Sequence, residues 1–130
     1  MPGLGNSAML IGAAVLLLVM SVFHSLVGER YVLGPIKANN TLPEMWGSRV
    51  YTFRTIQATW HLVSALWLGL AVYWTALSVV PDQAVQVSLI AFGVLFGVLA
   101  IVPLVWDSGE HKSYIPFGLI SVLLLASALI

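Results

Sequence analysis

The sequence predicts an all-α integral membrane protein, a four-helix antiparallel bundle with an interfacial connector between its first two helices. Three observations support this fold class. Hydrophobic residues make up 60% of the 130 residues and charged residues only 8%, with a mean hydropathy of +1.00. The apolar residues fall in four long runs, and the basic residues all lie on one side of the resulting topology. A chain of this composition has too little polar surface to face water, so lipid is expected to cover it.

Four apolar runs are long enough to cross a membrane, for which about 18 consecutive apolar residues suffice. The spans are expected within a single domain, residues 1–130, at about residues 8–28, 55–79, 84–106 and 113–130. No Lys or Arg precedes Arg30, so the first run lacks the basic region of a cleaved signal peptide. We therefore interpret it as a retained span.

The connector between the first two spans, about residues 29–54, contains the breaks Gly34-Pro35 and Leu42-Pro43. A continuous helix is not expected there, because glycine and proline interrupt helices. The connector also carries aromatic residues interspersed with Lys and Arg, a composition typical of the lipid headgroup layer. It is therefore predicted to lie in the membrane interface.

Four spans place this connector and the loop at residues 107–112 on the same side of the membrane. All five basic residues lie on that side: Arg30, Lys37, Arg49, Arg54 and Lys112. Because basic residues concentrate on the cytoplasmic side of membrane proteins, the sequence predicts a multi-pass protein with both termini outside.

Charge and cysteine content exclude several classes of function. The five Lys and Arg residues are balanced by five Asp and Glu residues, so no basic surface is available to bind nucleic acid. The chain has no cysteine, which excludes disulfides, zinc ribbons and thiol catalysis. The expected partner is the lipid bilayer, together with further copies of the chain or a larger membrane complex.

Polar residues inside the first two spans form two stripes. At helical spacing, one face of the first span carries Ser21, His24, Ser25 and Gly28, and one face of the second carries Arg54, Gln57, His61 and Ser64. Polar stripes of this kind turn toward protein, because a polar group exposed to lipid is costly. At the rise of an α-helix, His24 lies about 7–8 Å inside the boundary at Glu29, and His61 about 10–11 Å inside Arg54. The two imidazoles are therefore expected at nearly the same depth.

The leading functional hypothesis is a cytoplasm-facing intramembrane histidine site that binds haem or a transition metal for redox chemistry or electron transfer. Imidazole is the commonest metal ligand, and two imidazoles facing each other across a bundle suit haem iron. In the haem version His24 and His61 are the axial ligands, and the cations for the propionates are Arg30, Arg49 or Arg54.

A non-haem version of the site uses the same two histidines and adds ligands from the cytoplasmic boundary. Its predicted metal ligands are His24, His61, Glu29 and His111, with Asp107 as a further candidate.

Three alternatives stay open at this level. The two histidines form hydrogen bonds to Ser21, Ser25, Gln57, Ser64 or each other and hold two helices together. In a second alternative the stripes line a polar cavity that binds a small molecule or carries protons. In a third, the chain is a non-enzymatic structural or accessory subunit of a larger membrane complex. The G-x-x-x-G at Gly93 and Gly97 motivates this last reading, although such a pattern indicates close helix packing more often than chemistry.

Two further patterns concern packing and catalysis. Trp60, Trp67 and Trp74 recur every seven residues, which indicates a lipid-facing or packing ridge. The chain has no phosphate-binding loop, no H-E-x-x-H and no nucleophile elbow, so the sequence assigns no catalytic residue.

The stretch His24-Ser25-Leu26-Val27-Gly28-Glu29-Arg30, followed by Trp60-His61-Leu62-Val63-Ser64, resembles a pattern in small, uncharacterised four-span bacterial membrane proteins. The resemblance covers mainly the first two helices and their connector. It implies a bacterial inner (cytoplasmic) membrane and suggests that the H-S-x-x-G-E and W-H-x-x-S patterns belong together. It carries over no activity.

Overall fold

The computed structural model describes residues 4–39, 41–106 and 111–130, and in these ranges the chain is helical with no strand. The elements in chain order are α1 (Leu4–Gly28), the π-helix η1 (Glu29–Leu33), α2 (Gly34–Ala38), α3 (Arg49–Val79), the 3₁₀ turn η2 (Pro81–Gln83), α4 (Ala84–Trp106) and α5 (Tyr114–Ala128).

Three helical stretches are long and apolar enough to cross a membrane: Asn6–Ala38, Arg49–Val79 and Pro81–Val105. The fourth predicted span is also helical, but α5 has only 15 residues. A helix of that length measures about 22 Å, less than the hydrocarbon core of about 30 Å. The prediction of helices is confirmed, whereas the fourth is shorter than a typical span.

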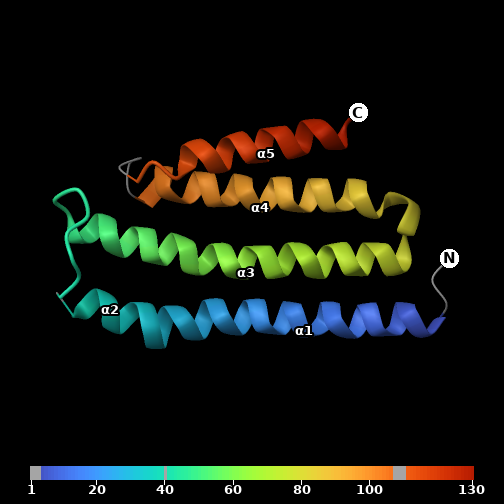
Figure 1. Ribbon diagram of the computed structural model, residues 1–130, viewed down its shortest axis with the longest axis horizontal. Helices are drawn as coiled ribbons and strands as arrows, with labels where there is room; N and C mark the ends of the chain where they lie inside the picture. The colour runs from blue at the N-terminus through green and yellow to red at the C-terminus, as the bar shows by residue number, and fades with distance from the viewer. Residues whose placement is uncertain (1–3, 40, 107–110) are drawn as a thin grey trace.

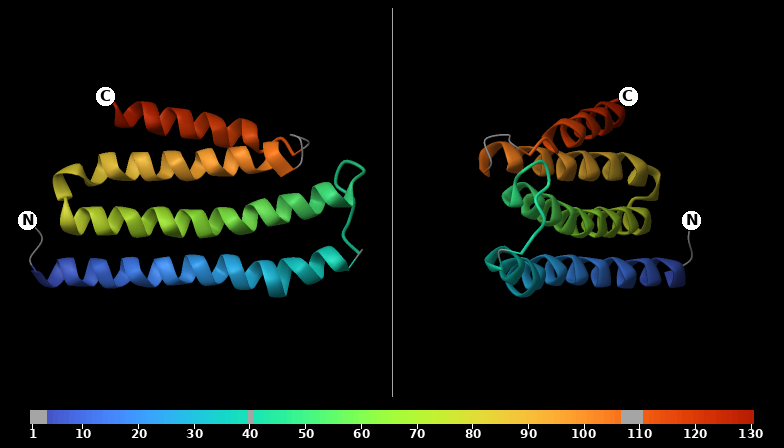
Figure 2. Two further views of the ribbon diagram at one scale, coloured as in Figure 1. Left: turned by 180° about the vertical axis from the view of Figure 1, so that it is seen from behind. Right: turned by 60° about the vertical axis from the view of Figure 1, so that its left-hand side comes forward.

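The helices α1, α3, α4 and α5 lie side by side in one row, and the connections between them alternate between its two ends (Figure 1). Each helix packs on the next one in chain order, and the same order is visible from behind and from the side (Figure 2). The helices α1 and α5 therefore form the two edges of the row. Since each inner helix has close neighbours on two sides only, Leu33 is the one large side chain in the described ranges that is fully buried.

The connector between α1 and α3 is shorter than the predicted 29–54, because helix extends into it from both ends. The chain continues helically through η1 and α2, and Pro35 lies in the first turn of α2. The backbone N–H of Gly34 donates to the carbonyl of Glu29, which closes the π-turn. At the other end α3 begins at Arg49, because the hydroxyl of Ser48 accepts a hydrogen bond from the backbone N–H of Tyr51 at 3.2 Å.

The helices α4 and α5 are in close contact through small residues. The hydroxyl of Ser121 on α5 donates to the carbonyl of Gly93 at 2.7 Å. A Cβ atom at Gly97 would lie 3.0 Å from the same hydroxyl oxygen, and one at Gly93 would lie 2.7 Å from Leu125 Cγ. The predicted packing role of the G-x-x-x-G is confirmed, and the face that it forms is occupied by α5.

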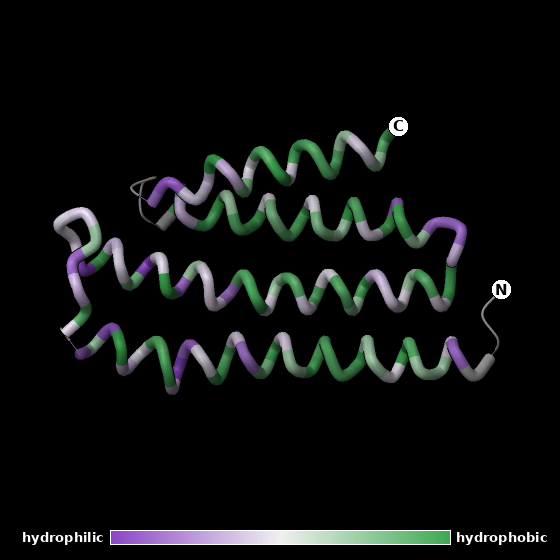
Figure 3. The backbone as a smooth tube through the Cα atoms, viewed as in Figure 1, coloured by the Kyte–Doolittle hydropathy of each residue, from purple (hydrophilic) through white to green (hydrophobic). Residues whose placement is uncertain are grey.

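Hydrophilic residues gather at one end of the row, around α2, the beginning of α3 and the segment leading into α5, and a smaller hydrophilic segment lies at the η2 turn at the opposite end (Figure 3). The remaining helical surface is mostly hydrophobic. Large apolar side chains along α1, such as Leu16, Val19 and Phe23, are exposed, as expected for helices that face lipid.

Candidate functional site

The two polar stripes of α1 and α3 face each other. At the inner end of this interface, the hydroxyl of Ser21 on α1 donates to the carbonyl of Ser64 on α3 at 2.8 Å. One turn nearer the polar end, each histidine contacts a serine of the opposite helix, His24 with Ser64 and His61 with Ser25. The predicted match in depth is therefore confirmed.

His24 is held on three sides by α3. Its Nδ1 lies 3.0 Å from the hydroxyl of Ser64, and its ring stacks on the indole of Trp60 with centroids 4.4 Å apart and planes 6° apart. Trp60 Nε1 donates to the carbonyl of His24 at 2.9 Å, and Trp67 packs edge-on against the imidazole at 5.1 Å. The tryptophan series is therefore a packing ridge at these two positions.

Gly28 provides the space for this arrangement. A Cβ atom there would lie 2.7 Å from Trp60 Cζ2 and closer still to Nε1 and Cε2 of the same ring. The backbone of Gly28 is ordinary right-handed helix, at φ −61° and ψ −46°. Glycine is thus required by the close approach of the indole and not by the backbone conformation.

His61 is the centre of a hydrogen-bonded chain that ends at the polar boundary. Its Nδ1 lies 2.7 Å from Ser25 Oγ, and its Nε2 lies 3.0 Å from Glu29 Oε2. Gln57 Nε2 donates to both carboxylate oxygens of Glu29, at 3.0 and 3.2 Å, and Arg54 donates to Gln57 Oε1 at 2.9 Å. About a third of the His61 side chain (32%) and 47% of the Glu29 side chain are exposed, so water can reach this chain.

The hydrogen-bond partners assign the tautomer of His61. An ionised carboxylate only accepts hydrogen bonds, so the Nε2 that faces Glu29 carries the proton. In the neutral ring Nδ1 is then unprotonated and accepts the hydrogen bond of the Ser25 hydroxyl. This arrangement couples a serine, an imidazole and a carboxylate in series.

A cavity of about 300 Å³ opens between α3, α4 and α5 beside this chain; we call it the α3–α4–α5 cavity. Its apolar walls are Ala58, Val98, Leu99, Val102, Pro103 and Phe117, and its polar lining residues are Arg54, Gln57, His61 and His111.

His111 is buried at this end of the row. Its Nε2 lies 3.0 Å from Thr55 Oγ1 and its Nδ1 lies 2.8 Å from Ser113 Oγ. The ring of Tyr51 packs against it at 4.9 Å. Both ring nitrogens of His111, like those of His61, are therefore engaged by protein groups.

A second hollow, of about 320 Å³, is lined by residues of α1, α3 and α4 and again includes His61; we call it the Ser25 groove. Its polar lining residues are Ser21, Ser25, His61 and Ser64, and its apolar ones are Val22, Leu26, Ala65, Leu68 and Leu95. His24 is among the lining residues of neither hollow, because its ring is enclosed between the two helices. The two histidines therefore share neither of these two hollows.

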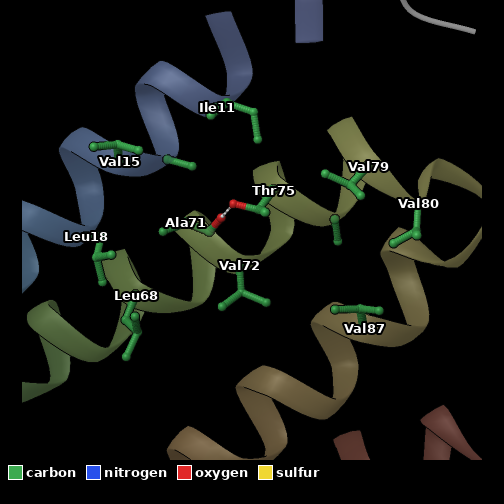
Figure 4. Close-up of a pocket in the computed structure, with 12 residues that line it drawn as sticks. Ile11, Val15, Leu18, Leu68, Ala71, Val72, Thr75, Val79, Val80 and Val87 are labelled. Atoms are coloured by element: carbon green, nitrogen blue, oxygen red, sulfur yellow. Dashed lines mark hydrogen bonds between the residues drawn. The ribbon is translucent and has the colours of Figure 1, made fainter. Parts of the chain in front are cut away.

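A third hollow, of about 530 Å³, lies between α1 and α3 near the opposite end of the row (Figure 4). Its lining is aliphatic except for Thr75, whose hydroxyl donates to the carbonyl of Ala71 at 2.8 Å. The hollow has room for an apolar ligand, but its described lining residues include no reactive side chain.

The predicted metal ligands do not come together in the structure. Across residues 4–39, 41–106 and 111–130 no group of three or more His, Cys, Asp or Glu side chains is placed to hold one metal ion. Glu29 joins His61, whereas His24 and His111 have separate partners. Asp107 lies outside the described residues, and so does Glu110.

The predicted cationic residues also differ in position. Arg54 lines the α3–α4–α5 cavity, whereas Arg30 is exposed and lies over the ring of Tyr31 at 5.6 Å. Metal or haem binding stays a prediction. The alternative in which both histidines bond to serines of the facing helix is confirmed as geometry.

Sequence reasoning named Ser25 only as a hydrogen-bond partner. The sequence nevertheless indicates the hydrogen-bonded chain through His61. Ser25 and Glu29 are four residues apart, so they lie on one face of a helix and can contact the same side chain of a neighbouring helix. The π-turn that begins at Glu29 could not be read from the sequence in the same way.

Comparison of the chain with protein families, with curated proteins and with solved structures found no match.

Proposed function

We propose that this protein resides in a membrane and binds a small amphiphile in the α3–α4–α5 cavity, with the ligand's carboxylate or carbonyl head at the polar end. The observation that carries the proposal is the lining of the cavity, in which apolar side chains of α4 and α5 face a cluster of hydrogen-bonding groups on α3. Apolar pockets with a few convergent polar groups are the usual form of small-molecule sites, and their volumes begin at about 300 Å³.

The charge of the lining favours an acceptor or anionic head. Arg54 lines the cavity with a guanidinium, which is always cationic and matches carboxylate geometry. None of the described lining residues is acidic. An anionic or acceptor head is therefore attracted to the guanidinium of Arg54, and a cationic head is repelled by it.

The membrane part of the proposal is supported by the three long apolar stretches and by the positions of the basic residues. In the proposed topology the polar end of the row faces the cytoplasm and both termini lie outside. The α3–α4–α5 cavity then lies near the cytoplasmic boundary, where an amphiphile dissolved in the bilayer places its head.

A photoactivatable palmitic acid that carries a diazirine on its chain tests this function. The full-length protein in detergent is irradiated with the probe, and the crosslinked peptides are identified by mass spectrometry. Crosslinks to α3 and α4 are expected, with competition by excess palmitic acid but not by hexadecane.

The matched variants are Ala58→Trp, which fills the cavity, and Thr59→Trp, which places the same ring on the neighbouring exposed position of α3. Ala58→Trp is expected to abolish the crosslinks and Thr59→Trp to keep them. Equal crosslinking of both variants, or equal competition by hexadecane, would contradict the proposal.

Haem or metal binding at His24 and His61 is the second candidate, and the same preparation tests it. Ligation would require ring nitrogens that now contact Ser64, Ser25 and Glu29. A visible spectrum and metal analysis after growth with iron and haem precursor decide whether such a site forms.

A further inference from the structure

We propose that Ser25, His61 and Glu29 form a nucleophile triad that hydrolyses acyl esters bound in the Ser25 groove. The proposal does not require a ligand in the α3–α4–α5 cavity, although His61 lines both that cavity and the Ser25 groove. The three groups stand in the order nucleophile, base and carboxylate, with contacts of 2.7 Å and 3.0 Å. Contacts of about 2.6–3.2 Å, with the base oriented by a third group, are the signature of an activated nucleophile.

The protonation states fit the chemistry. Because Nε2–H is donated to the carboxylate of Glu29, Nδ1 is free to take the proton of the Ser25 hydroxyl. The roles of the two ring nitrogens are exchanged relative to the serine protease arrangement, in which Nδ1–H faces the carboxylate. Both arrangements hold the imidazole in one tautomer and stabilise the imidazolium that forms.

Glu29 is fixed in place by its neighbours. The side-chain amide of Gln57 donates to both carboxylate oxygens, and Arg54 in turn donates to the oxygen of that amide. Glu29 and Gln57 are positioning residues, since they act on the substrate only through His61.

The Ser25 groove indicates the class of substrate. Ser25 and Ser64 provide its polar lining beside His61, and the aliphatic side chains of α1, α3 and α4 continue it. An acyl chain therefore lies along the aliphatic part with its carbonyl carbon at Ser25 Oγ. When His24 carries its proton on Nδ1, that nitrogen donates to Ser64 Oγ. The Ser64 hydroxyl can then donate its own hydrogen to the carbonyl oxygen of the bound ester.

The reaction balances with water as the only co-reactant. Ser25 Oγ bonds to the ester carbonyl carbon while its proton passes to His61 Nδ1. The bond to the alcohol oxygen then breaks, and the alcohol leaves with that proton. Water attacks the acyl-Ser25 ester with His61 again as base, which releases the carboxylic acid and restores the serine. Exposure of His61 and Glu29 at the boundary lets this water enter.

An alkyl fluorophosphonate that carries a fluorophore tests the proposal, because it reacts with activated serines. The full chain in detergent is labelled, and the modified residue is mapped by peptide mass spectrometry. The label is expected on Ser25, and p-nitrophenyl octanoate is expected to be hydrolysed. His61→Gln is expected to slow both by about a hundredfold or more, the usual contribution of a general base.

The matched control is Ser127→Ala, which removes a hydroxyl on α5 that bonds within its own helix. It is expected to leave both rates unchanged. Mapping the label on the unaltered chain needs no variant to fold, so the test stays decisive if His61→Gln is unstable. A wild-type chain that shows no label on Ser25, or the same rate for His61→Gln in folded form, would overturn the proposal.

Discussion

Replacing Gly28 with alanine tests the central packing claim of the α1–α3 interface. The added methyl group would overlap the indole of Trp60, at 2.7 Å from Cζ2 and less from two other ring atoms. The ring must move, and it then loses both its hydrogen bond to the carbonyl of His24 at 2.9 Å and its stack on the imidazole at 4.4 Å.

The size of the effect follows from these losses. Overpacking costs about 1–3 kcal/mol, a hydrogen bond about 1 kcal/mol and an aromatic stack about 1 kcal/mol. Alanine recovers about 1 kcal/mol of helix propensity relative to glycine. Gly28→Ala is therefore expected to lower the free energy of unfolding by about 2–3 kcal/mol, since the terms overlap.

The assay is unfolding by SDS in mixed detergent micelles, followed by far-ultraviolet circular dichroism. Gly12→Ala is the matched control on the same helix, because a Cβ atom there meets nothing within 4 Å. It is expected to be neutral or slightly stabilising. Adding Trp60→Leu to Gly28→Ala should remove most of the additional cost of the alanine. Equal stability of the two alanine variants would contradict the close approach of the Trp60 indole to Gly28.

Three further predictions address the site, the other helix pair and the topology. Glu29→Gln is expected to slow fluorophosphonate labelling about tenfold, equivalent to about 1.4 kcal/mol. Glu29→Asp is expected to recover part of the rate. Equal labelling rates for the two variants would contradict the positioning role of the Glu29 carboxylate. Gly93→Ala is expected to destabilise the α4–α5 pair by about 1–2 kcal/mol in the SDS assay, and Gly118→Ala, whose Cβ would lie 3.8 Å from Ala100 Cβ, to be tolerated. Because the chain lacks cysteine, Asn39→Cys and Gln83→Cys give single labelling sites. A membrane-impermeant maleimide should label Gln83→Cys in intact cells and Asn39→Cys only after permeabilisation, and the reverse would invert the topology.

The number and type of elements could be predicted from the sequence, because long apolar runs have few alternatives to helix in this composition. The residues at which these helices begin and end were harder to predict. The Gly34-Pro35 sequence predicted that the helix would end there. In the structure the helix continues through a π-turn and past Pro35 to Ala38. The early beginning of α3 depends on the Ser48 cap, a local contact that hydropathy does not show.

The residues that form the site could be predicted better than the hydrogen bonds between them. Helical spacing placed His24 and His61 at nearly the same depth, and this is confirmed. Spacing does not say which way a ring turns, so it left open whether His24 and His61 meet each other or the serines opposite. In the structure the His24 ring stacks on Trp60 inside the α1–α3 interface. The His61 ring lies at the edge of that interface and contacts Ser25, so the two imidazoles meet serines and not each other.

Among the residues that the structure describes, His61 is the one that lines both the α3–α4–α5 cavity and the Ser25 groove. A His61 variant therefore disturbs both proposed activities and cannot distinguish them. Ala58→Trp and Ser25→Ala can, because each alters a residue that lines one hollow only. If the hollows act separately, Ala58→Trp keeps serine labelling and Ser25→Ala keeps crosslinking to palmitic acid. Loss of both activities in both variants would instead mean that the imidazole couples the two hollows, since no other described residue lines both.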